Sequence, residues 1–241
     1  MTREIWSEII GTLGLRATRD NDHMRTITAL AFLLFAVSMS SAEGWLLKSP
    51  YQPHTKMKWK VVTDTTVSEH AVQSVVTHIL KIASDVDGKA TGTLDFTDME
   101  INGNKSGFDA PTWDMVFARD GMLTTAGGGP DCLRQLAPTT FIYPNKEVAV
   151  GATWEATLKF DENGKGAKAK FTVLEMTKLH EEDVLKVKTT LAEESGLHSE
   201  GLFWLSKEGM VLKYKVDVKN WTVAGSGIPS LDAKLTGELV K

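Results

Sequence analysis

Hydrophobic and polar residues alternate along most of the chain after residue 43. In segments 154–160, 212–218 and 231–235 every second residue is apolar and the residues between are polar or charged, and the shorter run 113–117 has the same spacing. Successive side chains of a strand point to opposite faces. The pattern therefore predicts antiparallel strands with one face on a core and the other in water.

Short turn signals separate these runs. They are Asp87-Gly88, Asn102-Gly103, Asp120-Gly121, Asn163-Gly164 and Glu208-Gly209. Such pairs adopt the positive φ that tight hairpins require. Their regular spacing predicts an antiparallel meander of roughly ten strands. The predicted fold class is all-β with a minor α part, arranged as a half-barrel or barrel.

Segment 126–150 interrupts the alternation. It begins with a Gly-rich stretch, after which Asp131 is predicted as the N-cap of a short helix near residues 131–136. Pro138 is expected to end this helix, and an apolar loop follows at 141–145. Glycine-flanked apolar segments serve either as lids over a pocket or as plain connectors. The sequence leaves both interpretations open.

A faint internal repeat is present. Segments 117–123 and 205–211 both contain an apolar residue, two variable residues, an acid, Gly, Met and an aliphatic residue. A strand led by Trp lies upstream of each, at Trp59 and at Trp154. Two duplicated halves joined at 126–150 would explain the repeat, and so would independent convergence of two hairpins on the same chemistry.

The first 42 residues have a different composition. An apolar run at 27–37 follows Met24-Arg25, and Ser40 and Ala42 are the small residues expected before a cleavage after Ala42. The run is shorter than the about 20 residues of a membrane-spanning helix. Residues 24–42 are therefore predicted to be a signal peptide rather than a buried helix, and residues 1–23 are not expected to belong to the native structure.

Cleavage at that point would leave residues 43–241 as a single β-rich domain. This mature chain is expected in the periplasm or outside the cell, with no integral membrane span after processing. The net charge of −4 argues against a nucleic-acid partner, which would require a basic surface. Cys132 is the only cysteine, so no intramolecular disulfide can form, and we expect a buried thiol.

The sequence contains no complete motif for catalysis, a cofactor or a metal. The chain contains no Gly-x-Ser-x-Gly and no phosphate-binding glycine loop. The segment from Asp161 begins like a calcium loop, but Lys165 and Thr172 occupy positions that need oxygen ligands. His70 and His78 could share a strand face, although a hydrogen-bonded core histidine is the preferred interpretation of His78. Enzymatic activity is left open and is not favoured.

Segment 148–154, the alternating strands after it, and the Glu208-Gly209 turn before a long strand resemble uncharacterised secreted bacterial β-proteins. These are distantly similar to the half-barrel lipoprotein carriers, the localisation factors that shuttle lipoproteins across the periplasm. The resemblance implies a curved antiparallel sheet whose apolar concave face can hold acyl chains. The chain departs from that class in having only the helix near 131–136 as a plug, and no functional residue carries over.

Three functions follow from this pattern. The first is an exported binding or carrier protein for an apolar ligand, such as a lipid or the acyl chain of a lipoprotein. The alternative is a structural or protein-interaction domain of the cell envelope, and a hydrolase is less favoured. For the first, the predicted ligand-binding residues are Trp113, Met115, Phe117, Leu133, Leu136 and Phe141.

Overall fold

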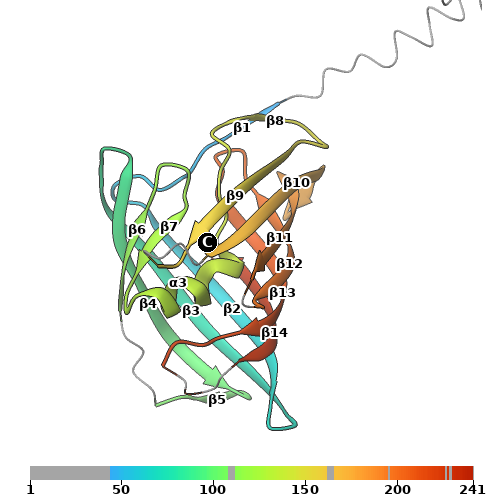
Figure 1. The fold of residues 1–241 in the computed structure, drawn as a ribbon. Coiled ribbons are helices and arrows are strands. Elements are labelled where there is room, and N and C mark those ends of the chain that lie inside the picture. The colour runs from blue at the N-terminus through green and yellow to red at the C-terminus, as the bar shows by residue number, and fades with distance from the viewer. Residues whose placement is uncertain are drawn as a thin grey trace, which may run out of the picture. The chain divides into compact units, whose positions relative to one another are not determined.

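The alternating segments form the strands of one large antiparallel sheet in the computed structural model (Figure 1). The structure describes residues 44–107, 112–161, 166–194, 196–225, 227 and 230–240. Glu43–Lys241 make up one compact unit. The signal peptide predicted at 24–42, its cleavage after Ala42 and the segment 1–23 lie outside the described residues.

The strands and helices have the following bounds. The main sheet contains β2 (Lys56–Val67), β3 (His70–Val86), β4 (Lys89–Ile101), β5 (Asn104–Lys105), β6 (Trp113–Phe117), β7 (Leu123–Ala126), β9 (Thr153–Lys159), β10 (Gly166–Leu179), β11 (Glu182–Glu193), β12 (His198–Leu205), β13 (Val211–Trp221) and β14 (Leu231–Leu239). A separate two-stranded ribbon joins β1 (Trp45–Leu47) to β8 (Lys146–Val148). The helices are α3 (Pro130–Leu136) and the short 3₁₀ helix η1 (Ala137–Thr139).

The order of the strands shows how the sheet is built. It runs β7-β6-β4-β3-β2-β14-β13-β12-β11-β10-β9, and β5 pairs with β4 beside this path. The strands from the two chain ends, β2 and β14, pair in the middle of the sheet, with Trp59 opposite Leu239. The edge strands β7 and β9 come from the middle of the chain. The sheet curls into a nearly closed barrel, which confirms the predicted fold class.

The hairpin turns explain the register. Asp87-Gly88 and Asn102-Gly103 have positive φ at both residues and connect adjacent strands, as predicted. Ser68-Glu69 and His180-Glu181 also have positive φ at both residues, although neither pair contains glycine. These two turns carry no sequence signal, which is one reason why the structure contains more strands than the roughly ten predicted. The turn predicted at Asn163-Gly164 lies outside the described residues.

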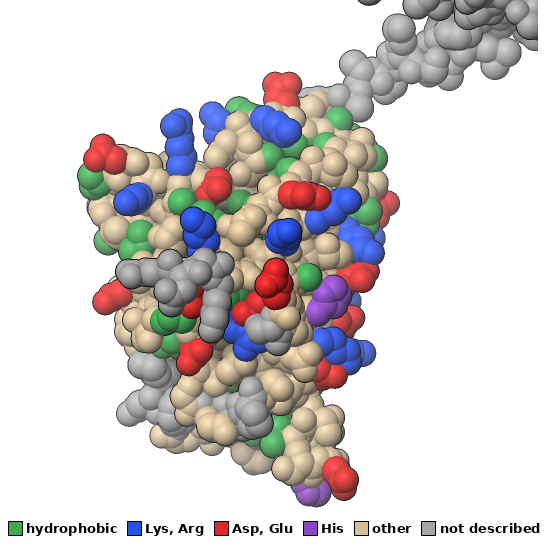
Figure 2. All heavy atoms as spheres, viewed as in Figure 1, with side chains coloured by type: hydrophobic (Ala, Val, Ile, Leu, Met, Phe, Trp, Pro, Cys, Tyr) green, Lys and Arg blue, Asp and Glu red, His purple; other side chains and the backbone are tan. Residues whose placement is uncertain are grey.

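Alternation along the strands separates the core from the outer surface. In β13, Leu212, Tyr214, Val216 and Val218 are buried, whereas the residues between them are partly or fully exposed. Figure 2 shows charged side chains of both signs spread over the outer surface in this view, with hydrophobic side chains scattered among them. The concave side of the sheet is therefore apolar and the convex side is polar.

The connection between β7 and β8 differs from its prediction at the start of the helix. Asp131 is not the N-cap: α3 begins at Pro130, and Gly129 occupies the N-cap with φ +105 and no side-chain cap. Proline suits the first helical position because it has no N–H to leave unpaired there, so Asp131 falls in the first turn instead. Pro138 does not end the helical segment either: it lies in η1, which follows α3 directly.

The two segments of the sequence repeat form matching turns. In the β6–β7 hairpin, Ala118 accepts a hydrogen bond from Gly121 and donates one to Met122. In the β12–β13 hairpin, Ser206 makes the same two bonds, with Gly209 and Met210. Each turn follows the fourth strand of its own meander when β5 is set aside. The match fits two duplicated halves, and the duplication itself stays a prediction.

Candidate functional site

A connecting segment, residues 130–143, packs against the concave face of the sheet, and we call it the plug. It contains α3, η1 and the extended stretch that follows them. Within it, α3 packs against β7 and η1 packs against β13, so the plug contacts strands of both halves of the sheet. Eight of its residues are buried: Cys132, Leu133, Leu136, Ala137, Pro138, Phe141, Ile142 and Tyr143.

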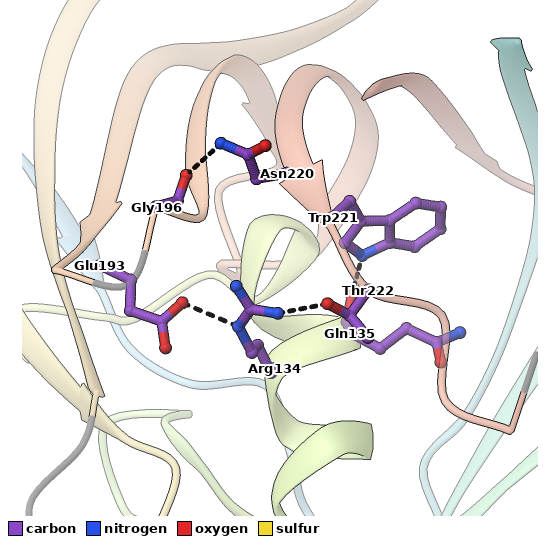
Figure 3. Close-up of polar contacts among 7 residues, drawn as sticks. All are labelled: Arg134, Gln135, Glu193, Gly196, Asn220, Trp221 and Thr222. Atoms are coloured by element: carbon purple, nitrogen blue, oxygen red, sulfur yellow. Dashed lines mark hydrogen bonds and ion pairs between the residues drawn. The ribbon is translucent and has the colours of Figure 1, made fainter. Parts of the chain in front are cut away.

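Polar contacts attach α3 to the ends of two strands of the second half (Figure 3). Arg134 donates from Nε to Glu193 Oε2 at 2.7 Å, and it also donates to the hydroxyl of Thr222. The backbone carbonyl of Gln135 accepts a hydrogen bond from Trp221 Nε1 at 2.9 Å. The side chains of Arg134 and Glu193 are 19% and 8% exposed, so this ion pair is only weakly screened by water.

Aromatic contacts hold the other end of the plug. Phe141 is 2% exposed, and its ring centroid lies 4.9 Å from Tyr143, 5.2 Å from Phe171 and 6.0 Å from Trp154, each in an edge-on arrangement. Trp154 also donates from Nε1 to the carbonyl of Ile142 at 2.9 Å. Edge-on aromatic pairs add to the free energy gained by burial alone. This end of the plug is therefore firmly packed.

Tyr143 links the two repeat-related turns to the plug. Its backbone N–H donates to the carbonyl of Asp120 at 2.7 Å, and its hydroxyl donates to the carbonyl of Gly209 at 2.8 Å. Burial, with a smaller contribution from nearby Tyr51, raises the pKa of Tyr143 well above its ordinary value of 10. The phenol therefore keeps its proton and remains a donor.

A cavity of about 90 Å³ lies between the plug and the sheet. Its apolar walls come from β3, β4, β6, β7 and β13 and from the plug, which contributes Leu136 and Phe141. Six further side chains in its wall carry polar groups: Tyr51, Trp59, His78, Thr139, Thr140 and Tyr214. Those of Trp59, Thr139 and Thr140 each donate a hydrogen bond to a backbone carbonyl. The cavity has room for several water molecules and is far smaller than the roughly 300–1,000 Å³ of ordinary ligand pockets.

The six residues predicted to bind a ligand all lie in one hydrophobic core. Four of them line the cavity: Met115, Phe117, Leu136 and Phe141. The cavity wall does not include Trp113, which packs edge-on against Phe96 with the ring centroids 4.9 Å apart. Leu133 is also buried in the core and outside the cavity wall. Ligand binding by the six residues stays a prediction.

Sequence reasoning missed the polar part of the cavity. His78 shares the inner face of β3 with Leu80 and Ile82, as expected, and it lies edge-on to Phe96 with centroids 4.9 Å apart. The sequence predicts a hydrogen bond to the ring of His78, but no described residue bonds its ring nitrogens. Burial lowers the pKa of His78 to about 4, so the ring is neutral at pH 7. The alternation along segment 212–218 predicts that Tyr214 faces the core, and this signal could have pointed to that residue.

Other candidate chemistry gains no support. Cys132 is buried at 5% exposure, which confirms the expectation for the only thiol. Among the described residues no group of three or more His, Cys, Asp or Glu side chains is placed to hold a metal ion. Neither described helix is long and apolar enough to cross a membrane.

Fold and site together define a nearly closed antiparallel β-barrel whose apolar interior is filled by a plug. No protein-family model matches this chain. No curated protein matches it either.

Two solved structures resemble the chain. One is a proposed exported protein with a YmcC-like fold from Bacteroides fragilis, at 9% identity and a TM-score of 0.32, covering 82% of this chain and 100% of its own. The other is a proposed outer-membrane lipoprotein-sorting protein domain from Vibrio parahaemolyticus, at 9% identity and a TM-score of 0.24, covering 80% and 86%. They match the class named from the sequence, but TM-scores this low bear on neither fold nor function.

Proposed function

We propose that this protein is an exported binding or carrier protein for an apolar ligand, such as a lipid or the acyl chain of a lipoprotein. The observation that carries the proposal is the plugged concave face. The sheet presents an apolar inner surface, and a short connecting segment packs against it. The proposed location, in the periplasm or outside the cell, rests on the signal-peptide pattern of residues 24–42.

Binding of an acyl chain requires the plug to move. The cavity of about 90 Å³ is too small for such a chain while the plug is in place. Displacing the plug would free the inner surface that Leu136 and Phe141 now cover. Gly127 and Gly129, with φ of +40 and +105, lie just before the plug and could absorb the change in backbone direction.

The plug is attached in a way that permits such a motion. At its α3 end the contacts include hydrogen bonds and the Arg134–Glu193 ion pair, whose groups water can solvate once the helix leaves the sheet. At its other end the Phe141 cluster is apolar, and a ligand chain could take its place against the same strand residues. A ligand would thus compete with the plug for one surface.

Ligand content and ligand uptake test the proposal. The full chain, expressed with its leader and recovered after export, is expected to carry lipid that native mass spectrometry and solvent extraction detect. Arg134→Met should speed uptake of the fluorescent probe N-phenyl-1-naphthylamine. Lys81→Met is the matched control, because Lys81 pairs with Asp95 at 2.7 Å on the exposed side of the sheet. If the exported protein carries no lipid and neither it nor its variants take up the probe, the proposal is overturned.

One observation favours the second candidate, an envelope domain that binds a protein and no small ligand. The cavity is small and Phe141 is packed on several sides, as in an ordinary filled core. In that case the plug would never leave the sheet, and its backbone amides would exchange with solvent only when the whole domain unfolds. Hydrogen exchange across residues 130–143 separates the two candidates.

A further inference from the structure

Three polar side chains in the cavity wall have no protein partner for their polar atoms. Tyr51 precedes β2, His78 lies in β3 and Tyr214 lies in β13. No described residue hydrogen-bonds the hydroxyl of either tyrosine or a ring nitrogen of His78. In the same region no side-chain nitrogen or oxygen is both sealed from solvent space and unpaired. The three polar groups therefore reach accessible space, and all three residues line the cavity.

Four other polar side chains of the core do have a protein partner. The hydroxyl of Tyr143 bonds the carbonyl of Gly209, and the indoles of Trp59, Trp154 and Trp221 each bond a backbone carbonyl. Buried polar groups are nearly always satisfied, because leaving one unpaired costs more than a hydrogen bond returns. Three groups without a protein partner around one small cavity are thus available to hydrogen-bond water or a ligand.

The cavity is polar without being charged. Within the part of the chain that the structure describes, no Lys, Arg, Asp or Glu lies in its wall. His78 is neutral at pH 7 because burial lowers its pKa to about 4, and burial raises the pKa of both Tyr51 and Tyr214, so neither phenol ionises. An ionised carboxylate, phosphate or ammonium group placed there would lack an opposite charge, which is strongly unfavourable. A neutral group that accepts hydrogen bonds would be satisfied by the two phenols and the imidazole.

We propose that Tyr51, His78 and Tyr214 form a recognition site for the neutral ester or amide linkage of an acylated ligand. This inference rests on the proposed function and names the chemical class of its ligand. A volume of about 90 Å³ accommodates a linkage and a few adjoining atoms. The chain itself would lie along the apolar surface that the plug vacates. All three residues lie outside the plug, so they remain on the sheet side when the plug moves.

A pair of probes with the same chain tests this site. The full chain is loaded with N-phenyl-1-naphthylamine, which is then displaced below micelle-forming concentrations by monododecanoylglycerol or by dodecanoate at pH 8. The neutral ester is expected to bind at least about tenfold more tightly than the carboxylate, given the cost of burying an unpaired charge. Tyr214→Phe and Tyr51→Phe should each weaken binding of the ester about two- to tenfold and leave the carboxylate unchanged.

Tyr143→Phe provides the matched control. It removes a phenol hydroxyl of the same core, but that hydroxyl already bonds Gly209 and lies outside the cavity wall. The preference for the ester should therefore survive in this variant. Equal affinity for the two probes, or a preference that both cavity Tyr→Phe variants retain, would overturn the linkage site and leave the carrier function standing. Binding of neither probe would overturn both.

Discussion

The packing of Phe141 allows a quantitative test of how the plug is held. Phe141→Ala removes a ring that is 2% exposed and is surrounded by the rings of Tyr143, Trp154, Phe171 and Phe203. Replacing a buried Phe by Ala costs about 3–5 kcal/mol, since both burial and packing are lost. The ring belongs to the plug and its neighbours are mostly on strands, so the loss should fall first on the attachment of the plug.

Hydrogen exchange read by mass spectrometry separates plug release from global unfolding. A loss of about 3 kcal/mol in plug attachment raises exchange of the plug amides, including that of Tyr143, by more than about 100-fold. Amides of β12 should change far less. Leu185→Ala is the control, because Leu185 is 1% exposed on β11 and its loss weakens the sheet instead of the plug. If Phe141→Ala accelerates plug and strand amides equally, the plug is an inseparable part of the core and our reasoning fails.

Three further predictions concern stability and are read from urea unfolding followed by tryptophan fluorescence. A double-mutant cycle of Arg134→Met and Glu193→Gln should give a coupling of about 1.5–3 kcal/mol, typical of a hydrogen-bonded ion pair that is mostly buried; a value near zero contradicts the anchoring role. His78 has a folded pKa of about 4 and an ordinary value of 6.5, so the unfolded state binds the proton more tightly and stability is lost as pH falls from 6.5 to 4. That loss should reach about 3 kcal/mol and disappear in His78→Leu; an unchanged pH profile would show that the ring is hydrated. Gly209→Ala places a Cβ 2.2 Å from a backbone oxygen at φ +84 and should cost clearly more than Gly103→Ala, where φ is +77 but the surroundings are open; the strain common to both is about 1–3 kcal/mol.

Much of the fold could be predicted from the sequence because its signals are local. Alternation in segments such as 212–218 reports directly which face of a strand is buried. Glycine-containing turns such as Asp87-Gly88 mark hairpins for a similar reason. The turns at Ser68-Glu69 and His180-Glu181 gave no signal, because non-glycine residues adopt positive φ there only when the flanking strands impose it.

The candidate site was harder to predict because it depends on contacts distant in sequence. Met115, Phe117, Leu136 and Phe141 meet at the cavity, and they were found because apolar residues on an inner face and on a plug must share a core. Trp113 follows the same alternation but packs on Phe96, away from the cavity. Tyr51 precedes the first long strand and follows no periodic pattern, so only the folded arrangement brings it to His78 and Tyr214.

The central pairing of β2 with β14 makes the plug unnecessary for the continuity of the sheet. A single backbone cut between Gly127 and Gly129 would yield one piece that ends after β7 and another that begins with α3. The ladder from Trp59–Leu239 to Thr65–Ala233 would still join the two pieces. The molecule is thus laid out like a split protein with two complementary pieces, and the two cut ends would lie next to the plug.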